Sequence, residues 1–132
     1  MKDKEPVLEQ EQKFILLRDE IITKLKKTCP IEFKTQCVCV STRETDGGTI
    51  GLYLSSDGNW SGRVQMAGWP IGINPSIESL LNQYALTIND KGYKRLLNKG
   101  EEKMNEYVLK NKKRLLGSLL KEMDSTLKTW FI

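Results

Sequence analysis

The sequence predicts a single α+β domain over residues 1–132, with helices packed on one face of a three-stranded antiparallel sheet. Two observations lead to this prediction. Apolar residues recur at three- and four-residue steps towards both ends of the chain, which is typical of amphipathic helices. Between them, residues 36–66 alternate apolar and polar side chains around two Asp-Gly dipeptides, a pattern typical of β-hairpins.

The first helix is expected over residues 6–28. Its apolar side consists of residues at three- and four-residue steps, namely Phe14, Leu17, Ile21 and Leu25. Pro6 suits the first turn of a helix, where a missing N–H group costs nothing. Pro30 then ends the helix, because a proline removes a hydrogen bond from a helix interior.

Two hairpin loops, 45–47 and 56–58, organise the three-stranded meander over residues 36–66. Each is read as a three-residue loop whose glycine adopts a positive φ, which costs little without a Cβ atom. This register predicts the following apolar pairs: Val40 with Leu52, Val38 with Leu54, Leu54 with Trp60, and Ile50 with Val64. A slip by one residue would place apolar side chains opposite polar ones, so the register is well specified.

The two faces of the meander are predicted to differ in polarity. The core face is expected to comprise Val38, Val40, Ile50, Leu52, Leu54, Trp60 and Val64. The opposite face is expected to comprise Cys37, Cys39, Ser41, Arg43, Gly51, Tyr53, Ser61, Arg63 and Gln65. In an antiparallel sheet a face of this polarity is usually solvated, while the other packs on helices.

The remainder of the chain is predicted to be a loop followed by two or three helices. The segment 67–74 reads as a loop because of its glycines and proline. A helix is expected over 75–86, with Asn74 as its N-cap and Pro75 at its first position. Residues 90–129 are helical, either continuously or with a break near residue 100, where Gly100 weakens the pattern. Lys112 falls on the apolar side of the predicted C-terminal helix, which indicates a bend in the helix, a frayed middle or a local partner for the lysine.

The composition excludes several kinds of catalytic site. The chain has no histidine, which removes imidazole as a general base, as part of a nucleophile system and as a zinc ligand. No cofactor motif occurs and no cofactor is expected. The cysteines Cys29, Cys37 and Cys39 are interpreted as structural residues rather than a metal site, because their spacing lacks a second pair.

The cysteine count and the N-terminus also bear on location. An odd number of cysteines and a charged start without an apolar stretch argue against a secreted, disulfide-bonded protein. No run is long and apolar enough for a membrane span. The sequence therefore predicts a cytoplasmic protein that does not bind membranes.

Three surfaces are candidates for binding. The polar sheet face and the apolar loop around Trp69 together give one predicted partner site: Trp69, Ile71, Arg43, Tyr53, Arg63 and Gln65. The loop would either expose Trp69 as an interface anchor or fold back to close the core. The polar face would either hold an anionic group or remain an ordinary wet surface.

The third surface is a basic stripe on the C-terminal helix. Its members are separated by 7, 4, 7 and 7 residues: Lys103, Lys110, Arg114, Lys121 and Lys128. Residues 91–132 hold eleven cations and five anions, so the net charge of +4 conceals a basic C-terminal third. The stripe would either contact phosphates or form the solvated side of an amphipathic helix.

These features lead to three hypotheses. The first is a small non-enzymatic cytosolic binding protein of the inhibitor, immunity or adaptor kind, with a protein partner and a homodimer as one version. The second is a nucleic-acid or nucleotide-binding protein that uses the basic stripe and stacks bases on Tyr53 or Trp69. The third is an enzyme that works without histidine, for which the sequence selects no substrate.

Overall fold

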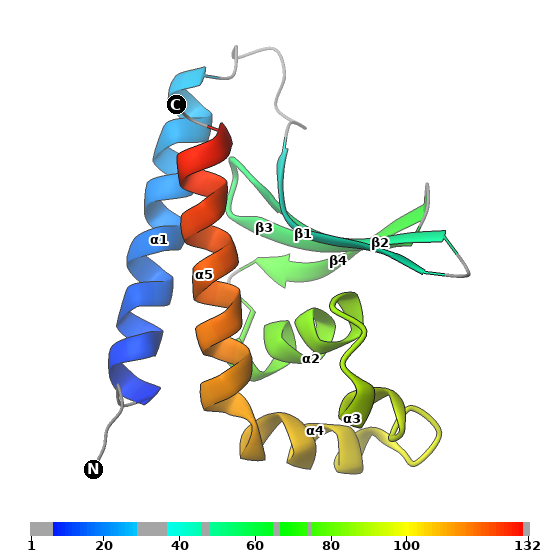
Figure 1. The fold of residues 1–132 in the computed structure, drawn as a ribbon. Helices are drawn as coiled ribbons and strands as arrows, with labels where there is room; N and C mark the ends of the chain where they lie inside the picture. Colours follow the sequence, from blue (N-terminus) through cyan, green and yellow to red (C-terminus); the bar gives the residue numbers. More distant parts are fainter. Residues whose placement is uncertain (1–6, 29–36, 46–47, 65–66, 74, 131–132) are drawn as a thin grey trace.

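The computed structural model describes residues 7–28, 37–45, 48–64, 67–73 and 75–130. It confirms the mixed α+β class, with a helix at the N-terminus, an antiparallel sheet and further helices at the C-terminus (Figure 1). The sheet has four strands instead of three, in the order β1-β2-β3-β4. The strands are β1 (Cys37–Thr45), β2 (Gly48–Ser55), β3 (Asn59–Val64) and β4 (Ala67–Ile73).

Strand β4 corrects the prediction that this segment is a loop. Its residues pair antiparallel with β3, and Gly62 lies opposite Trp69 while Ser61 lies opposite Pro70. The register shifts between Trp60 and Ser61, and Gly72 has a φ of +129°. Pro70 is tolerated because β4 is an edge strand. The N–H groups on the outer side of an edge strand bind no neighbouring strand, so a proline can stand at such a position without loss of a hydrogen bond.

The hairpin between β2 and β3 has the predicted register. Leu54 lies opposite Trp60 and Ile50 lies opposite Val64. Gly58 has a φ of +89°, which is the left-handed conformation expected at the end of this loop. The glycine of the other predicted loop, Gly47, lies outside the described residues.

The hairpin between β1 and β2 follows the predicted register at one end only. Val38 lies opposite Leu54 as expected, but the register shifts between Cys39 and Ser41. Ser41, and not Val40, therefore lies opposite Leu52. Such a β-bulge inserts one extra residue into a strand, and the residues beyond it then change faces relative to simple alternation.

The helices differ from the prediction mainly at their ends. They are α1 (Val7–Thr28), α2 (Ile77–Thr87), α3 (Lys91–Lys94), α4 (Glu101–Lys110) and α5 (Lys112–Trp130). The predicted cap Asn74 lies outside the described residues. The N-cap of α2 is Ser76, whose hydroxyl accepts a hydrogen bond from the Ser79 N–H group, so Pro75 precedes the cap.

The C-terminal helical region is broken near Gly100, as the sequence allowed, and again at Asn111. The second break separates α4 from α5, and these helices point in clearly different directions (Figure 1). Lys112 lies just after it, and its ammonium group binds Glu11 at 2.7 Å and Glu78 at 2.5 Å. The unusual position of Lys112 thus reflects both a bend and local partners on α1 and α2.

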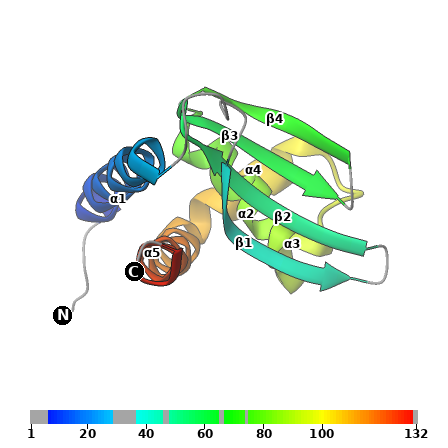
Figure 2. The same ribbon diagram turned by 90° about the horizontal axis from the view of Figure 1, so that it is seen from above.

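All described helices lie on one side of the sheet or beyond its edge (Figures 1 and 2). Helices α2 and α5 contact the strands, while α1 packs mainly along α5. The core between these elements includes large side chains that are almost fully buried: Phe14, Ile21, Leu52, Leu54, Trp60, Leu80, Leu81, Tyr84, Leu115, Leu119 and Met123. The rings of Phe14 and Trp60 stack with centroids 6.0 Å apart, which ties α1 to β3.

Candidate functional site

Arg43 lies on the helix-facing side of the sheet, which corrects its predicted place on the polar face. Beyond the bulge in β1, Arg43 pairs with Ile50 and Ser41 pairs with Leu52. Directly paired residues share a face, and Leu52 is a core residue. Ser41 is accordingly 3% exposed. The outer face receives Thr42 and Glu44 instead, so β1 contributes an acidic group and not a basic one to this face.

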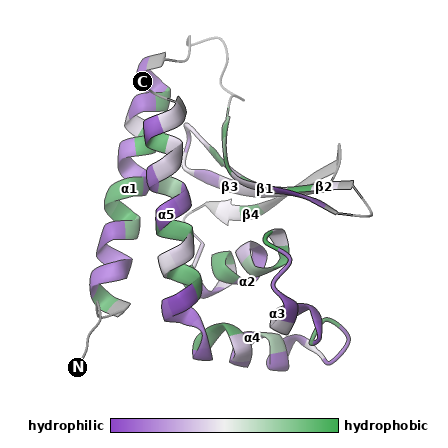
Figure 3. Ribbon diagram, in the orientation of Figure 1, coloured by the Kyte–Doolittle hydropathy of each residue, from purple (hydrophilic) through white to green (hydrophobic). Residues whose placement is uncertain are grey.

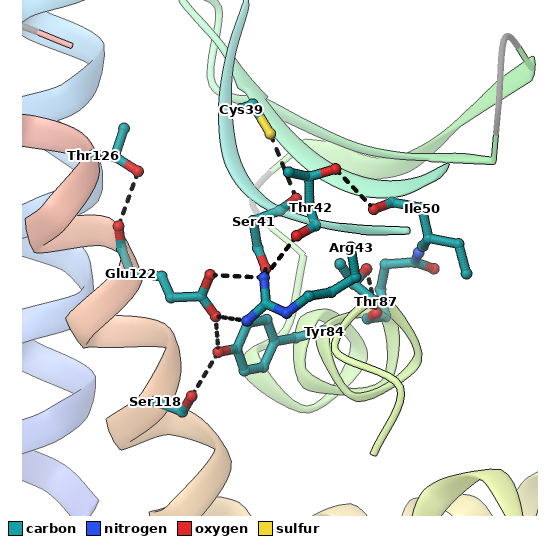
Figure 4. Close-up of polar contacts among 11 residues, drawn as sticks. Cys39, Ser41, Thr42, Arg43, Ile50, Tyr84, Thr87, Ser118, Glu122 and Thr126 are labelled. Carbon is teal, nitrogen blue, oxygen red and sulfur yellow. Dashed lines mark hydrogen bonds and ion pairs between the residues drawn. The ribbon is translucent and has the colours of Figure 1, made fainter. Parts of the chain in front are cut away.

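Arg43 forms part of a polar cluster that joins β1, α2 and α5 (Figure 4). Its guanidinium donates to the two carboxylate oxygens of Glu122 over 3.5 and 3.3 Å. The hydroxyl of Tyr84 also donates to Glu122, and it shares a 2.7 Å hydrogen bond with Ser118. Arg43 donates further to the backbone oxygen of Thr42 at 2.7 Å. Every group at the centre of the cluster therefore has a partner within the chain.

The electrostatics of the cluster favour a protonated Tyr84. Burial raises the pKa of Tyr84 far above its usual value, and its hydrogen bond to Glu122 raises it further. The phenol thus remains a donor to the carboxylate at any physiological pH. A hollow of about 200 Å³ lies beside the cluster, lined by Val40, Glu122, Ser125, Thr126 and Thr129. With its carboxylate already shared, Glu122 holds the three elements together and offers little to a bound molecule.

The sheet face opposite the helices is not covered by any described segment (Figure 2). We call it the uncovered face, and its members include Cys37, Cys39, Thr42, Glu44, Thr49, Gly51, Tyr53, Ser55 and Ser61. The ring of Tyr53 lies over Gly51, because a Cβ atom there would meet the ring at 2.5 Å. An aromatic ring that lies over a glycine offers a half-buried apolar surface in the middle of this face.

Two cysteines flank this ring at the β1 edge of the sheet. Cys37 and Cys39 are free thiols of intermediate exposure. Burial raises the pKa of the Cys39 thiol, although a hydrogen bond with Tyr53 acts in the opposite direction. Among the described residues, no group of three or more potential ligands could hold a metal ion. Both thiols lie on the uncovered face, where Cys39 pairs directly with Tyr53 and Cys37 with Ser55.

The predicted partner site is only partly assembled. Tyr53 lies on the uncovered face, while Arg43 lies on the other side of the sheet. Ile71 is half buried and packs against the core, so it does not serve as an exposed anchor. The side chains of Arg63 and Trp69, and all of Gln65, lie outside the described residues.

The predicted basic stripe is interrupted, because it requires one continuous helix and the break at Asn111 divides it. Lys103 and Lys110 lie on α4, whereas Arg114, Lys121 and Lys128 lie on α5. Two of the α5 cations are paired within the chain: Arg114 with Asp90 at 3.0 Å, and Lys128 with Asp124 at 3.0 Å. The five cations are therefore divided between two helices that point in different directions (Figure 1).

Sequence reasoning missed the residues at the centre of the polar cluster. Tyr84 lies on the buried side of α2, and its sequence position does not reveal that its hydroxyl binds Glu122. Ser118 and Glu122 are four residues apart and therefore lie on one side of α5. Both positions are next to the buried residues Leu115, Leu119 and Met123. A carboxylate beside buried apolar residues indicates a polar partner in the interior, and this pattern could have predicted the cluster.

No family model matches this chain, and searches of curated proteins and of solved structures find no match either. None of the described helices combines the length and apolar character needed to cross a lipid bilayer. The class that the fold defines is an α+β domain with one helix-covered and one uncovered sheet face.

Proposed function

We propose that this chain is a non-enzymatic binding protein of the inhibitor, immunity or adaptor kind, which docks a partner protein on the uncovered face of its sheet. The single observation that supports this proposal is that all described helices leave this face free (Figures 1 and 2). A four-stranded sheet packed on one side only presents a broad and rigid surface. The flat ring of Tyr53 lies in the middle of it, and tyrosine is enriched at the centres of protein interfaces.

The polar cluster supports a role in binding over one in catalysis. A catalytic carboxylate needs a free oxygen or a mobile proton, whereas Glu122 is shared by Arg43 and Tyr84. The phenol of Tyr84 is fully buried, and its raised pKa keeps its proton in place. The cluster acts as a clamp that fixes β1 against α2 and α5 and so keeps the uncovered face rigid.

The nature of the surface supports a protein partner in a reducing compartment such as the cytoplasm. The thiols of Cys37 and Cys39 are free and lie on the face that the partner would cover. The bulge in β1 places Glu44, and not Arg43, on this face. The loss of the Arg43 guanidinium from this face removes one of the cations that a phosphate-rich ligand was expected to contact.

The experiment compares two serine-to-glutamate variants in affinity capture from the native cell lysate. Ser61 lies beside Tyr53 on the uncovered face, and Ser61→Glu places a charge there without entering the core. Ser79 is exposed in the first turn of α2, on the helical side, where a glutamate suits the helix N-terminus. The wild type and Ser79→Glu are expected to retain one stoichiometric protein, and Ser61→Glu is expected to lose it.

Two outcomes would contradict the proposal. If all three forms retain the same protein, the partner binds elsewhere on the surface. If the retained material is nucleic acid, released by salt in all three forms, the chain belongs to the second class that the sequence suggested. Circular dichroism of each variant establishes that a loss of binding is not a loss of folding.

A further inference from the structure

A groove of about 540 Å³ runs between α1 and α5, away from the uncovered face. Its lining combines apolar, charged and amide side chains: Gln10, Lys13, Leu16, Leu17, Gly117, Leu120, Lys121 and Asp124. In Figure 1 the two helices lie side by side and run in the same direction, and no described segment lies on the outer side of α1. Figure 3 shows hydrophobic bands along α1 between hydrophilic ones.

Two features of the groove indicate that it lacks an occupant. Leu16 lines it and is 68% exposed, so together with Leu17 and Leu120 it forms a contiguous apolar surface that no described segment covers. The side chain of Gln10 is buried, and its Oε1 atom has no hydrogen-bond partner among the described residues. Its amide nitrogen is already used by the backbone oxygen of Lys113. A buried acceptor without a donor is costly, so a donor from an occupant would stabilise the groove.

The charges along α1 identify the occupant. Glu9, Lys13, Leu16, Glu20 and Lys24 follow one another at steps of four, three, four and four residues. At about 100° per residue, these positions fall on one side of the helix. Along this stripe the charges therefore read negative, positive, then a central leucine, then negative, positive.

This order is self-complementary when two copies of α1 pair antiparallel. If Leu16 of one copy lies opposite Leu17 of the other, Lys13 lies opposite Glu20 and Glu9 lies opposite Lys24. Two-fold symmetry forms each ion pair twice. The same register brings the exposed Leu16 against Leu17, which lines the partner's groove. A parallel pairing in register would instead place like charges together.

We propose that the groove between α1 and α5 is a homodimer interface, in which the Leu16 side chain of each copy enters the groove of the other. The two copies of α1 and α5 then form an antiparallel four-helix arrangement around the two-fold axis. Lys13 and Lys24 keep their contacts within the chain and also attract the carboxylates of the partner copy. This interface does not involve the uncovered face, so the inference stands apart from the proposed function.

Two leucines of α1 provide a matched pair of variants. Leu16 is 68% exposed and lines the groove, whereas Leu8 is 66% exposed and lies outside it. Sedimentation equilibrium of the full chain is expected to show a dimer for the wild type and for Leu8→Glu. Leu16→Glu is expected to raise the dimer dissociation constant by at least about tenfold, because the glutamate is forced into an apolar groove.

A charge exchange tests the register itself. Lys13→Glu alone, or Glu20→Lys alone, places like charges opposite each other and is expected to weaken the dimer. The double variant Lys13→Glu/Glu20→Lys restores opposite charges across the axis and is expected to recover the wild-type dissociation constant. The control Lys103→Glu, at an exposed position of α4, is expected to change nothing.

Three outcomes would overturn the proposal. The first is a wild-type chain that stays monomeric at millimolar concentration. The second is an equal effect of Leu8→Glu and Leu16→Glu, which would indicate a general response to added charge. The third is a double exchange that is no better than either single variant, which would exclude the antiparallel register.

Discussion

Arg43 on β1 and Glu122 on α5 form an ion pair, with Nη2 and Oε2 3.3 Å apart, although simple alternation along β1 would place Arg43 on the opposite face. The β-bulge between Cys39 and Ser41 explains this pairing, because it reverses the faces of all later residues of the strand. The pair thus removes a cation from the uncovered face and uses it to join the sheet to the helical layer.

The clamp is expected to depend on Tyr84 more than on Arg43. Tyr84→Phe removes the phenol donor from the Glu122 carboxylate and the phenol acceptor from the Ser118 hydroxyl, so we expect a loss of about 1–2 kcal/mol in the free energy of unfolding. Arg43 is 44% exposed, and Arg43→Ala is expected to cost less than about 1 kcal/mol. Urea denaturation of both variants measures the two losses. A larger loss for Arg43→Ala would show that the surface ion pair, and not the buried phenol, holds the clamp.

Lys112 is expected to contribute to stability through its two carboxylate partners. Its side chain is only 14% exposed and it binds Glu11 and Glu78. Lys112→Met preserves the aliphatic part of the side chain but leaves both carboxylates without this partner. We expect the free energy of unfolding, measured by urea denaturation, to fall by about 1–2 kcal/mol. Lys113→Met is the control, since Lys113 is its exposed neighbour. Equal effects of the two substitutions would contradict the assignment.

Stability is expected to fall in acid. The pKa of Asp90 is lowered, because hydrogen bonds from Tyr107, the Tyr93 N–H group and Arg114 outweigh the opposing effect of burial. The pKa of Glu78 is lowered by its hydrogen bond with Lys112. A carboxyl with a lowered pKa in the folded state contributes stability above its unfolded pKa and loses it as the pH falls. Thermal unfolding below about pH 4 measures this effect, and Asp90→Asn is expected to flatten the profile.

Stability is also expected to fall in alkali. Burial raises the pKa values of Tyr84, Tyr93 and Tyr107, and hydrogen bonds to carboxylates raise those of Tyr84 and Tyr107 further. In the unfolded chain these phenols lose their protons near pH 10. A group with a raised pKa in the folded state contributes stability below its unfolded pKa and loses it at higher pH. Absorbance of tyrosinate during a pH titration is expected to rise together with unfolding, and full ionisation of a still folded chain would contradict this.

The sequence predicted the elements whose patterns are strong and local. The helical steps from Phe14 to Leu25 and the alternation around Gly58 were enough to place α1 and the hairpin of β2 and β3. Strand β4 was missed because glycines and a proline indicate a loop, and only the pairing with β3 makes that segment a strand. An edge position tolerates such residues, but edge positions are not visible in a sequence.

The candidate site was harder to predict, because it depends on two irregularities. The bulge in β1 moves Arg43 to the other face. The sequence on either side of Val40 is compatible with a regular strand and with a bulged one, so it does not reveal the bulge. The break at Asn111 involves neither glycine nor proline, so the helical periodicity continues through it and places the basic stripe on one helix. The bend is instead associated with tertiary contacts, as the ion pairs of Lys112 with α1 and α2 indicate.

A photo-crosslinker attached to a single cysteine tests directly whether a partner protein docks on the uncovered face. In Cys29→Ser/Cys39→Ser, the remaining Cys37 carries the probe on the uncovered face. In Cys29→Ser/Cys37→Ser/Cys39→Ser/Ser79→Cys, the probe lies on the helical side instead. After exposure to native lysate, we expect one protein adduct from position 37 and none from position 79. An adduct from position 79 alone would contradict docking on the uncovered face.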